Sequence, residues 1–267
     1  MEKTACFVVT VLMMFTVSGF AIAEDITIVG TGSGMTLLKA IGDAFTQKNP
    51  DIKIIIPESI DSSGGIKAVG TDKYKIGRVS REIKDTEKEY GLTYVPIAKM
   101  PIVFFTNKSV AVKDITPQQV CDIYSGKLTN WKDAGGGDEG IRVIRRQDGD
   151  SALMVLIKSL EGFKNITITE KSKTTLTAQE TILLAEQKTG TIAFAPYEST
   201  LNHNLNILSI NGKKVTEPDY LYYSVLALIF KGDNNTGNIR KFIVFVKSPD
   251  AREIIMQSGG LPFSSKP

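Results

Sequence analysis

Three glycine- and serine-rich turns, each between an apolar run and a run with helical periodicity, most constrain the fold of this chain. They are Gly30–Gly34, Asp61–Gly65 and Asp148–Ser151. A helix N-terminus carries backbone N–H groups without intrahelical partners, and these groups together with the helix dipole attract anions. Glycine and serine are also common in ordinary loops and caps, so one such turn is weak evidence. Three turns, the last shortly after Arg145 and Arg146, predict several helix ends around one small anionic ligand.

The first 23 residues have the pattern of a secretory signal peptide. Lys3 supplies a positive charge, Cys6–Phe20 is mostly apolar, and Ala21–Ala23 forms a small-residue cleavage site before Glu24. A membrane anchor is the less favoured alternative, because the apolar run is short for a span and cleavage residues follow it directly. We therefore expect an exported protein that is cleaved after Ala23.

Charge, cysteine and histidine content argue against several function classes. The chain has 32 lysines and arginines against 29 aspartates and glutamates, without the basic stripe of a nucleic-acid-binding protein. Cys6 leaves with the signal, so Cys121 has no disulfide partner and is expected to be a small buried side chain. The one histidine, His203, lies in a polar stretch, and the sequence has no Gly-x-Ser-x-Gly elbow or paired-histidine motif. We expect a binding protein that is not an enzyme and uses no metal or cofactor.

Strands and helices alternate along the chain, which is typical of an α/β fold in which much of the sheet is parallel. Thr116–Gln119 predicts a helix start, with Thr116 as N-cap, a proline at the first position and Gln119 closing a capping box, and Gly126 ends this helix. Expected strands span residues 26–29, 52–56, 94–98, 102–106, 141–145, 191–195 and 225–230. Other expected helices span residues 35–48, 152–160, 177–188, 239–247 and 250–257, and one begins near residue 66.

Six segments, in order along nearly the whole chain after residue 23, resemble periplasmic substrate-binding proteins of the phosphate-transport type. The most specific is Ile123–Trp131, which resembles the family's I-[FY]-x-G-K-[IL]-x-N-W. Each segment is weak alone, but six in register argue against coincidence. The other five are the strand leading into Gly30–Gly34, Ser62–Ile66 (S-G-G-G-I), Ile76–Ile83 (I-G-x-x-S-R-x-[LI]), Arg146–Gly149 (R-x-[DE]-G) and Gly190–Phe194 (G-x-I-[GA]-[FY]).

This resemblance implies a two-lobed type II periplasmic-binding-protein fold, with a hinge that the chain crosses twice, near Lys99–Pro101 and near Ala195–Tyr197. Lobe one would comprise residues 24–99 and 197–267, and lobe two residues 100–196. A small anion, phosphate or a related oxyanion, would be gripped in the cleft as the lobes close. The resemblance also implies a periplasmic location and an ABC permease partner in the inner membrane, and we expect a monomer. A periplasmic sensor or interaction module with the same cleft remains the alternative, because closure on a ligand is common to both uses.

The resemblance further implies ligand contacts from both lobes. An anion that leaves water needs its lone pairs satisfied, and arginine contacts to phosphate are often bidentate. Arg78, Arg81 and Arg145 are expected to be solvated charges. The expected ligand-binding residues are Thr31, Gly32, Ser33, Gly34, Ser62, Ser63, Gly64 and Ser80 in lobe one, and Arg146, Gly149, Asp150 and Ser151 in lobe two.

One segment departs from the family pattern. Phosphate binders of the family continue R-x-[DE]-G with S-G-T, whereas this chain has Asp150-Ser151-Ala152. An ionised carboxylate only accepts hydrogen bonds, and it repels a nearby anion unless it pairs with Arg145 or Arg146 or accepts a proton from the ligand. This departure leaves several ligands open: phosphate, another oxyanion, an organic ligand with a hydroxyl or amine, or no ligand at all.

Overall fold

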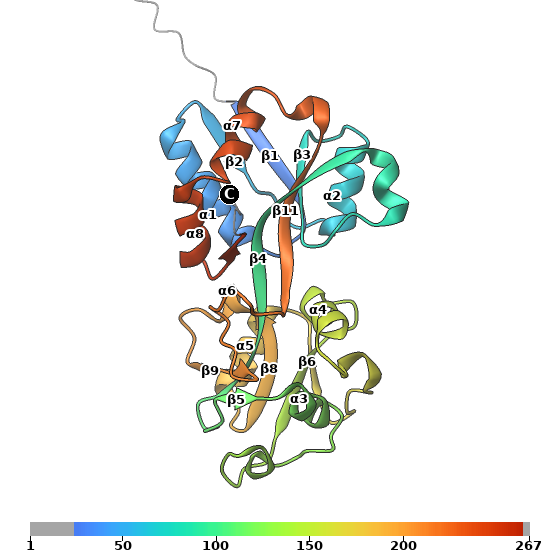
Figure 1. Ribbon diagram of the computed structural model, residues 1–267, viewed down its shortest axis with the longest axis vertical. Helices are drawn as coiled ribbons and strands as arrows, with labels where there is room; N and C mark the ends of the chain where they lie inside the picture. Colours follow the sequence, from blue (N-terminus) through green and yellow to red (C-terminus); the bar gives the residue numbers. More distant parts are fainter. Residues whose placement is uncertain (1–23, 264–267) are drawn as a thin grey trace, which may run out of the picture.

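The computed structural model describes residues 24–263, so the expected signal peptide and its cleavage site lie outside the described residues. Two lobes, one above the other in Figure 1, are joined by β4 (Leu92–Asn107) and β11 (Tyr223–Lys231). These two strands pair antiparallel, with Tyr223 opposite Pro101 at the waist of the molecule. Among residues 24–263, no helix is both long and apolar enough to span a bilayer.

Lobe one is a sheet in the strand order β2-β1-β3-β11-β4, with helices on both faces. Strand β1 pairs parallel with β2 and β3, whereas β11 pairs antiparallel with β3 and β4. The apolar residues of the first helix, Leu37, Leu38, Ile41 and Phe45, are all buried in its core, as their helical spacing predicts. The remaining elements are β1 (Glu24–Gly30), α1 (Met35–Lys48), β2 (Ile52–Ile55), α2 (Asp61–Gly70), β3 (Ile76–Val79), η1 (Asp85–Tyr90), η4 (Gly232–Asn234), α7 (Gly237–Phe245), α8 (Pro249–Gln257) and β12 (Leu261–Pro262).

Lobe two continues the sheet from β4 in the order β4-β8-β6-β7. Its core centres on the rings of Phe104, Tyr124 and Phe194, whose centroids lie 5.8 or 5.9 Å apart. Its elements are β5 (Asp114–Ile115), α3 (Pro117–Tyr124), η2 (Trp131–Ala134), β6 (Arg142–Arg146), α4 (Ser151–Ser159), η3 (Phe163–Asn165), β7 (Lys173–Thr175), α5 (Ala178–Gln187), β8 (Thr191–Pro196), α6 (Tyr197–Thr200), β9 (Leu205–Ile207) and β10 (Ser209–Ile210).

The sequence predicted the α/β two-lobed class and most element positions. Thr116 caps α3 as predicted: its Oγ1 accepts from the Gln119 N–H at 3.1 Å, and Gln119 Oε1 accepts from the Thr116 N–H at 2.9 Å. Much of the sheet is parallel, as predicted, in its β2-β1-β3 and β8-β6-β7 parts. The two connecting strands, β4 and β11, run antiparallel to their neighbours. The two strands expected around Pro101 form one strand, β4, with a register shift opposite Pro96 that accommodates a residue without an N–H.

The second crossing between the lobes lies later in the chain than 195–197. The core of lobe two contains Leu205, Leu208 and Tyr222, and Ile207 of β9 pairs with Phe105 of β4. The chain therefore returns to lobe one only at 222–223, and residues 197–222 belong to lobe two rather than lobe one. The family segments end at Phe194, so they carried no information about this stretch. The first crossing lies between Met100, in the core of lobe one, and Ile102, in the core of lobe two.

Candidate functional site

Three hydroxyl side chains of lobe one meet at the carboxyl ends of β1 and β3. Thr31 follows β1, Ser80 follows β3, and Ser62 lies in the first turn of α2. Thr31 Oγ1 lies 3.0 Å from Ser80 Oγ, and Ser80 Oγ lies 3.4 Å from Ser62 Oγ. The Ser80 N–H also donates to Ser62 Oγ at 3.1 Å. Parallel strands bring their carboxyl ends to one edge of a sheet, and residues distant in sequence therefore form one hydroxyl cluster.

Of the other ligand-binding residues expected in lobe one, some lie beside this hydroxyl cluster and some point away from it. The Ser33 N–H donates to Thr31 Oγ1 at 3.3 Å, and Gly32 is exposed beside it. Ser63 points elsewhere: its hydroxyl accepts from Arg81 Nη2 at 2.8 Å, and Arg81 also pairs with Glu87. Of the two neighbouring serines, only Ser62 joins the cluster.

The turn at residues 61–65 is the start of α2, whereas the sequence placed the helix start near residue 66. The N-cap of α2 is Ile60, which provides no side-chain cap. Gly64 packs beside Ile60, where an added Cβ would lie 3.2 Å from the Ile60 Cβ. The first turn of α2 thus presents Ser62 Oγ to Ser80 rather than to its own backbone N–H groups.

Arg78, expected to be solvated, is fully buried and holds the loop that carries Thr31. Its Nε donates to the Thr31 carbonyl at 2.7 Å, its Nη2 donates to the Pro57 carbonyl at 2.7 Å, and its Nη1 donates to the Ile28 carbonyl. Burial lowers the pKa of this guanidinium. The Arg78 carbonyl also accepts from the Thr31 N–H at 3.1 Å. The available signal was an arginine inside an otherwise apolar four-residue strand.

Replacement of Arg78 by methionine is expected to lower the free energy of unfolding by about 3 kcal/mol or more, because it leaves buried carbonyls without donors. Urea unfolding followed by circular dichroism measures this loss. Arg81→Met is the matched control: Arg81 is partly exposed, and a loss within about 1 kcal/mol is expected for its ion pair. Equal losses for the two variants would contradict a special structural role for Arg78.

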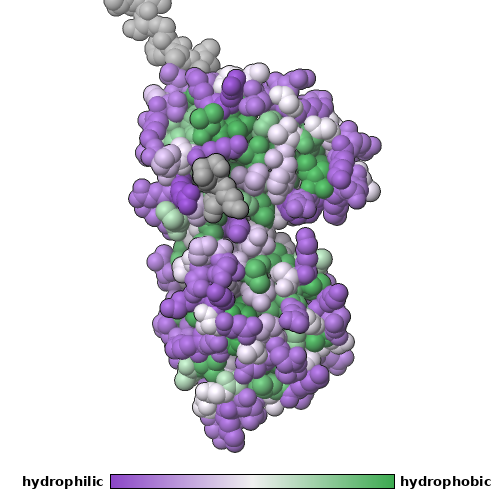
Figure 2. All heavy atoms as spheres, in the orientation of Figure 1, coloured by the Kyte–Doolittle hydropathy of each residue, from purple (hydrophilic) through white to green (hydrophobic). Residues whose placement is uncertain are grey.

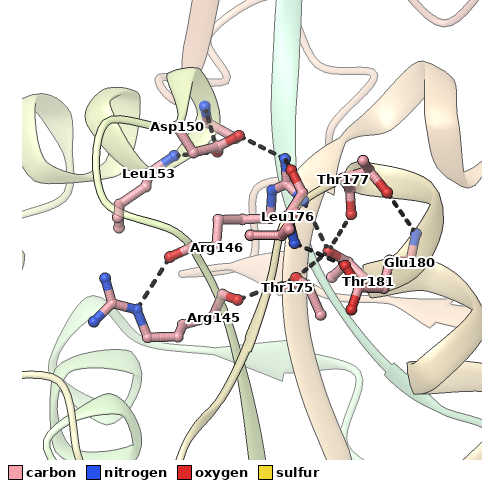
Figure 3. Close-up of polar contacts among 10 residues, drawn as sticks. Arg145, Arg146, Asp150, Leu153, Thr175, Leu176, Thr177, Glu180 and Thr181 are labelled. Atoms are coloured by element: carbon pink, nitrogen blue, oxygen red, sulfur yellow. Dashed lines mark hydrogen bonds and ion pairs between the residues drawn. The ribbon is translucent and has the colours of Figure 1, made fainter.

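Arg146 is the last residue of β6 and is buried in lobe two; Figure 3 shows its polar contacts. Its Nη2 lies 2.7 Å from Asp150 Oδ2 and donates to the Leu176 carbonyl at 3.0 Å. Its Nη1 lies 3.4 Å from Thr181 Oγ1. Within residues 24–263, the buried Nε has no hydrogen-bond partner. The guanidinium is therefore firmly held while one of its donors remains unused.

Asp150 pairs with Arg146 and caps α4 at the same time. Its Oδ1 accepts from the N–H groups of Ala152 and Leu153 at 3.0 and 3.1 Å, while Oδ2 faces Arg146 (Figure 3). The repulsion that this carboxylate would exert on an anionic ligand is thus partly offset by Arg146. The carboxylate also occupies the helix N-terminus, a position that attracts anions.

The other residues of the turn at 148–151 are more exposed than Asp150. Gly149 has φ +82°, a conformation that favours glycine, and Ser151 is exposed at the first position of α4. Arg145, expected to be solvated, is partly buried; it pairs with Asp148 and donates to the Arg146 carbonyl at 3.0 Å.

The hydroxyl cluster of Thr31, Ser62 and Ser80 belongs to lobe one, whereas Arg146 and Asp150 belong to lobe two. Helices α2 and α4 lie on the same side of the connecting strands in Figure 1, and Figure 2 shows the surface indented between the lobes. No hydrogen bond or ion pair joins Thr31, Ser62 or Ser80 to Arg146 in the part of the chain that the structure describes. A ligand that contacts both groups must therefore bridge the lobes.

Glu198 of α6 is a residue near the waist that sequence reasoning missed. Its Oε1 accepts from the Gly34 N–H at 3.3 Å, so it joins the segment after β8 to the N-terminus of α1 in lobe one. Its Oε2 is buried without a partner among the described residues, and burial raises the pKa of this carboxyl group. Glu198 lies beyond the matching family segments, and no spacing in the sequence connects it with Gly34.

Replacement of Glu198 by glutamine is expected to raise Tm by about 2–4 °C at pH 7, a shift worth roughly 1 kcal/mol in a protein of this size. The raised pKa means that the folded state binds the proton more tightly, so the charged form costs stability as pH rises through the folded pKa. Glutamine still offers Oε1 to Gly34 but carries no charge. The difference should vanish below about pH 4, where glutamates are protonated. Differential scanning calorimetry at several pH values measures this Tm difference, with Glu89→Gln, a change at an exposed glutamate, as the control. A Tm for Glu198→Gln below that of the wild type at pH 7 would contradict the prediction.

Cys121 and His203 lie outside both groups. Cys121 is buried, as predicted, its Sγ lies 3.4 Å from the Glu161 carbonyl, and burial raises the pKa of the thiol. His203 Nδ1 lies 3.2 Å from Glu186 Oε1. Among the described residues, no group of three or more metal-ligating side chains is placed to hold an ion.

Two lobes joined by paired strands, with polar groups on both sides of the waist, define a ligand-binding protein of the two-lobed class. The model of the PBP superfamily domain matches residues 18–250, and the chain belongs to this superfamily. It is 26% identical over 245 residues to the phosphate-binding protein PstS of Bacillus subtilis, which covers 88% of this chain and 79% of the relative.

Solved structures agree with this assignment. A phosphate ABC transporter substrate-binding protein from Clostridium perfringens, solved with bound phosphate, is 29% identical; the match covers 90% of this chain and all of that one, with a TM-score of 0.77. An ABC-type phosphate transport receptor from Vibrio cholerae matches the fold, with 19% identity and a TM-score of 0.69 over 89% of this chain and 99% of that one.

Proposed function

We propose that this protein captures phosphate, or a related tetrahedral oxyanion, between its lobes and delivers it to an ABC importer. The observation that carries the proposal is the pairing of a hydroxyl cluster in lobe one, Thr31, Ser62 and Ser80, with the buried Arg146 in lobe two. The relatives named as phosphate-binding proteins support the same ligand class. The signal-like N-terminus supports action outside the cytoplasmic membrane, as a monomer that presents its ligand to a membrane permease.

Each group has a distinct role in this proposal. The hydroxyls, with the N–H group of Gly32, donate hydrogen bonds to the oxyanion, because a desolvated anion needs a donor for each lone pair. Arg146 supplies the compensating charge and, through its unpaired Nε, a donor. Gly149, Ser151 and the start of α4 complete the wall in lobe two.

Asp150 is proposed to limit the affinity for phosphate, because its carboxylate competes with the ligand for Arg146 and offers only acceptor oxygens to an anion. Pairing with Arg146 offsets only part of the repulsion between this carboxylate and the ligand. The proposal includes no catalytic step, because a captured anion needs donors and charge but no nucleophile or base.

A thermal-shift screen followed by calorimetry tests the proposed function. A ligand at ~100 times its Kd adds about 2.7 kcal/mol by mass action, which should raise Tm by roughly 5–10 °C. Phosphate and arsenate are expected to produce this shift, and tungstate, sulfate and small organic acids complete the panel. A shift only with organic acids would assign a different ligand, and no shift with any anion would contradict capture.

A further inference from the structure

We propose that a second binding site, on lobe two and away from the cleft, takes a small organic anion with an apolar body. The site is a partly open cavity of about 420 Å³, within the size range of small-molecule sites. Its lining includes Arg142 and Thr191, the first residues of β6 and β8, and Lys173, the first residue of β7. This site goes beyond the proposed capture of an oxyanion between the lobes.

The direction of the strands separates the cavity from the cleft. Strand β6 runs parallel to β7 and β8, so their amino ends share one edge of the sheet. The cavity lies at that edge, whereas Arg146 lies at the carboxyl end of β6, roughly 13 Å further along at 3.3 Å per residue. An anion held by Arg146 therefore does not occupy the cavity.

The floor of the cavity is apolar. Ile123, Val143 and Ile144 are buried residues of the lobe-two core, and Leu128 and Leu184 are partly buried and pack against it. Leu128 and Leu184 are only partly buried, so part of their apolar surface is available to a ligand. Burying it under an apolar group is favourable, at about 25 cal/mol per Å².

The rim of the cavity is cationic. Arg142, Lys171, Lys173 and Lys188 line it, all four are exposed, and no aspartate or glutamate is among the lining residues. Within residues 24–263, none of these four side chains forms an ion pair. Four like charges around one cavity repel one another, and a bound anion relieves that repulsion.

The combination of floor and rim selects the ligand class. A phosphate or sulfate ion satisfies the cations but leaves the apolar floor in water. A neutral hydrocarbon covers the floor but leaves the cations uncompensated. A carboxylate with an aliphatic or aromatic body satisfies both, with its charged end at the rim and its body on the floor.

Titration of the protein with decanoate, followed by calorimetry and by amide NMR shifts, tests this site. Saturable binding is expected, with shifts at residues 123–129, 141–144 and 169–173, and decanol and inorganic phosphate should not produce those shifts. Phosphate should not displace decanoate, because the cleft and the cavity are separate.

Two kinds of variant locate the site. Lys171→Glu with Lys173→Glu should weaken decanoate binding at least tenfold, and Thr129→Trp, from an exposed lining position, should block the cavity. Lys39→Glu with Lys67→Glu, two exposed lysines of lobe one, is the matched charge control and should leave decanoate binding unchanged.

Non-saturable binding, or equal losses in both double variants, would overturn the proposal. Adsorption to vesicles of anionic lipid without saturable decanoate binding would also overturn it, because the cationic face would then be a membrane contact. These outcomes are independent of phosphate capture, which is read separately from shifts in the cleft.

Discussion

Replacement of Arg146 by lysine is expected to weaken phosphate binding by about 1.5–3 kcal/mol, the scale of a hydrogen bond to a charged group. This loss corresponds to a Kd roughly 10- to 150-fold higher. Lysine keeps the charge but loses the planar fork that reaches Asp150, Leu176 and a ligand at once. Isothermal titration calorimetry with phosphate measures the change.

Arg145→Lys is the matched control for this variant, because Arg145 is the preceding residue and pairs with Asp148 instead of facing Thr181. Its phosphate affinity should stay within a few fold of the wild type. If Arg146→Lys keeps full affinity but loses much of its Tm, then Arg146 is a structural residue that only orders the turn before α4.

Replacement of Asp150-Ser151-Ala152 by Ser-Gly-Thr is expected to tighten phosphate binding at least tenfold. Like charges a few ångströms apart cost on the order of 4 kcal/mol at an effective dielectric near 20, and pairing with Arg146 offsets part of this cost. The triple variant removes the carboxylate, releases Nη2 of Arg146 for the ligand and adds hydroxyl donors. A serine at position 150 still caps α4, so the fold should persist.

The control for the triple variant is Asp148→Asn, which removes one negative charge two residues away on an exposed side chain. It should change phosphate affinity only slightly, because solvent and salt screen that charge. Micromolar or tighter binding by the wild type, with no gain in the triple variant, would show that Asp150 does not limit phosphate affinity.

The sequence predicted those parts of the fold that depend on local patterns. The helix at 35–48 and the Thr116 cap follow from periodicity and capping chemistry, which act over a few residues. The partners of Arg78 could not be predicted, because the carbonyls of Ile28, Thr31 and Pro57 surround it only once three distant segments meet. The contact of Glu198 with Gly34 could not be predicted either, because these two residues are also far apart in the sequence.

Part of the candidate site could also be predicted from the sequence. Ser62 and Ser80 were singled out from family segments, and the structure brings them together with Thr31. The role of Asp150 needed the structure: the sequence left its partner open between Arg145 and Arg146, and the geometry pairs it with Arg146. The late crossing at 222–223 depends on the pairing of β9 with β4, which local pattern does not specify.

Small-angle X-ray scattering with and without saturating phosphate tests the central claim most directly, because the hydroxyl cluster and Arg146 lie in different lobes. If phosphate bridges the lobes, then the lobes close on it and the radius of gyration falls, while the Arg146→Lys variant at the same phosphate concentration closes less. A radius of gyration that stays constant while calorimetry shows bound phosphate would contradict capture between the lobes.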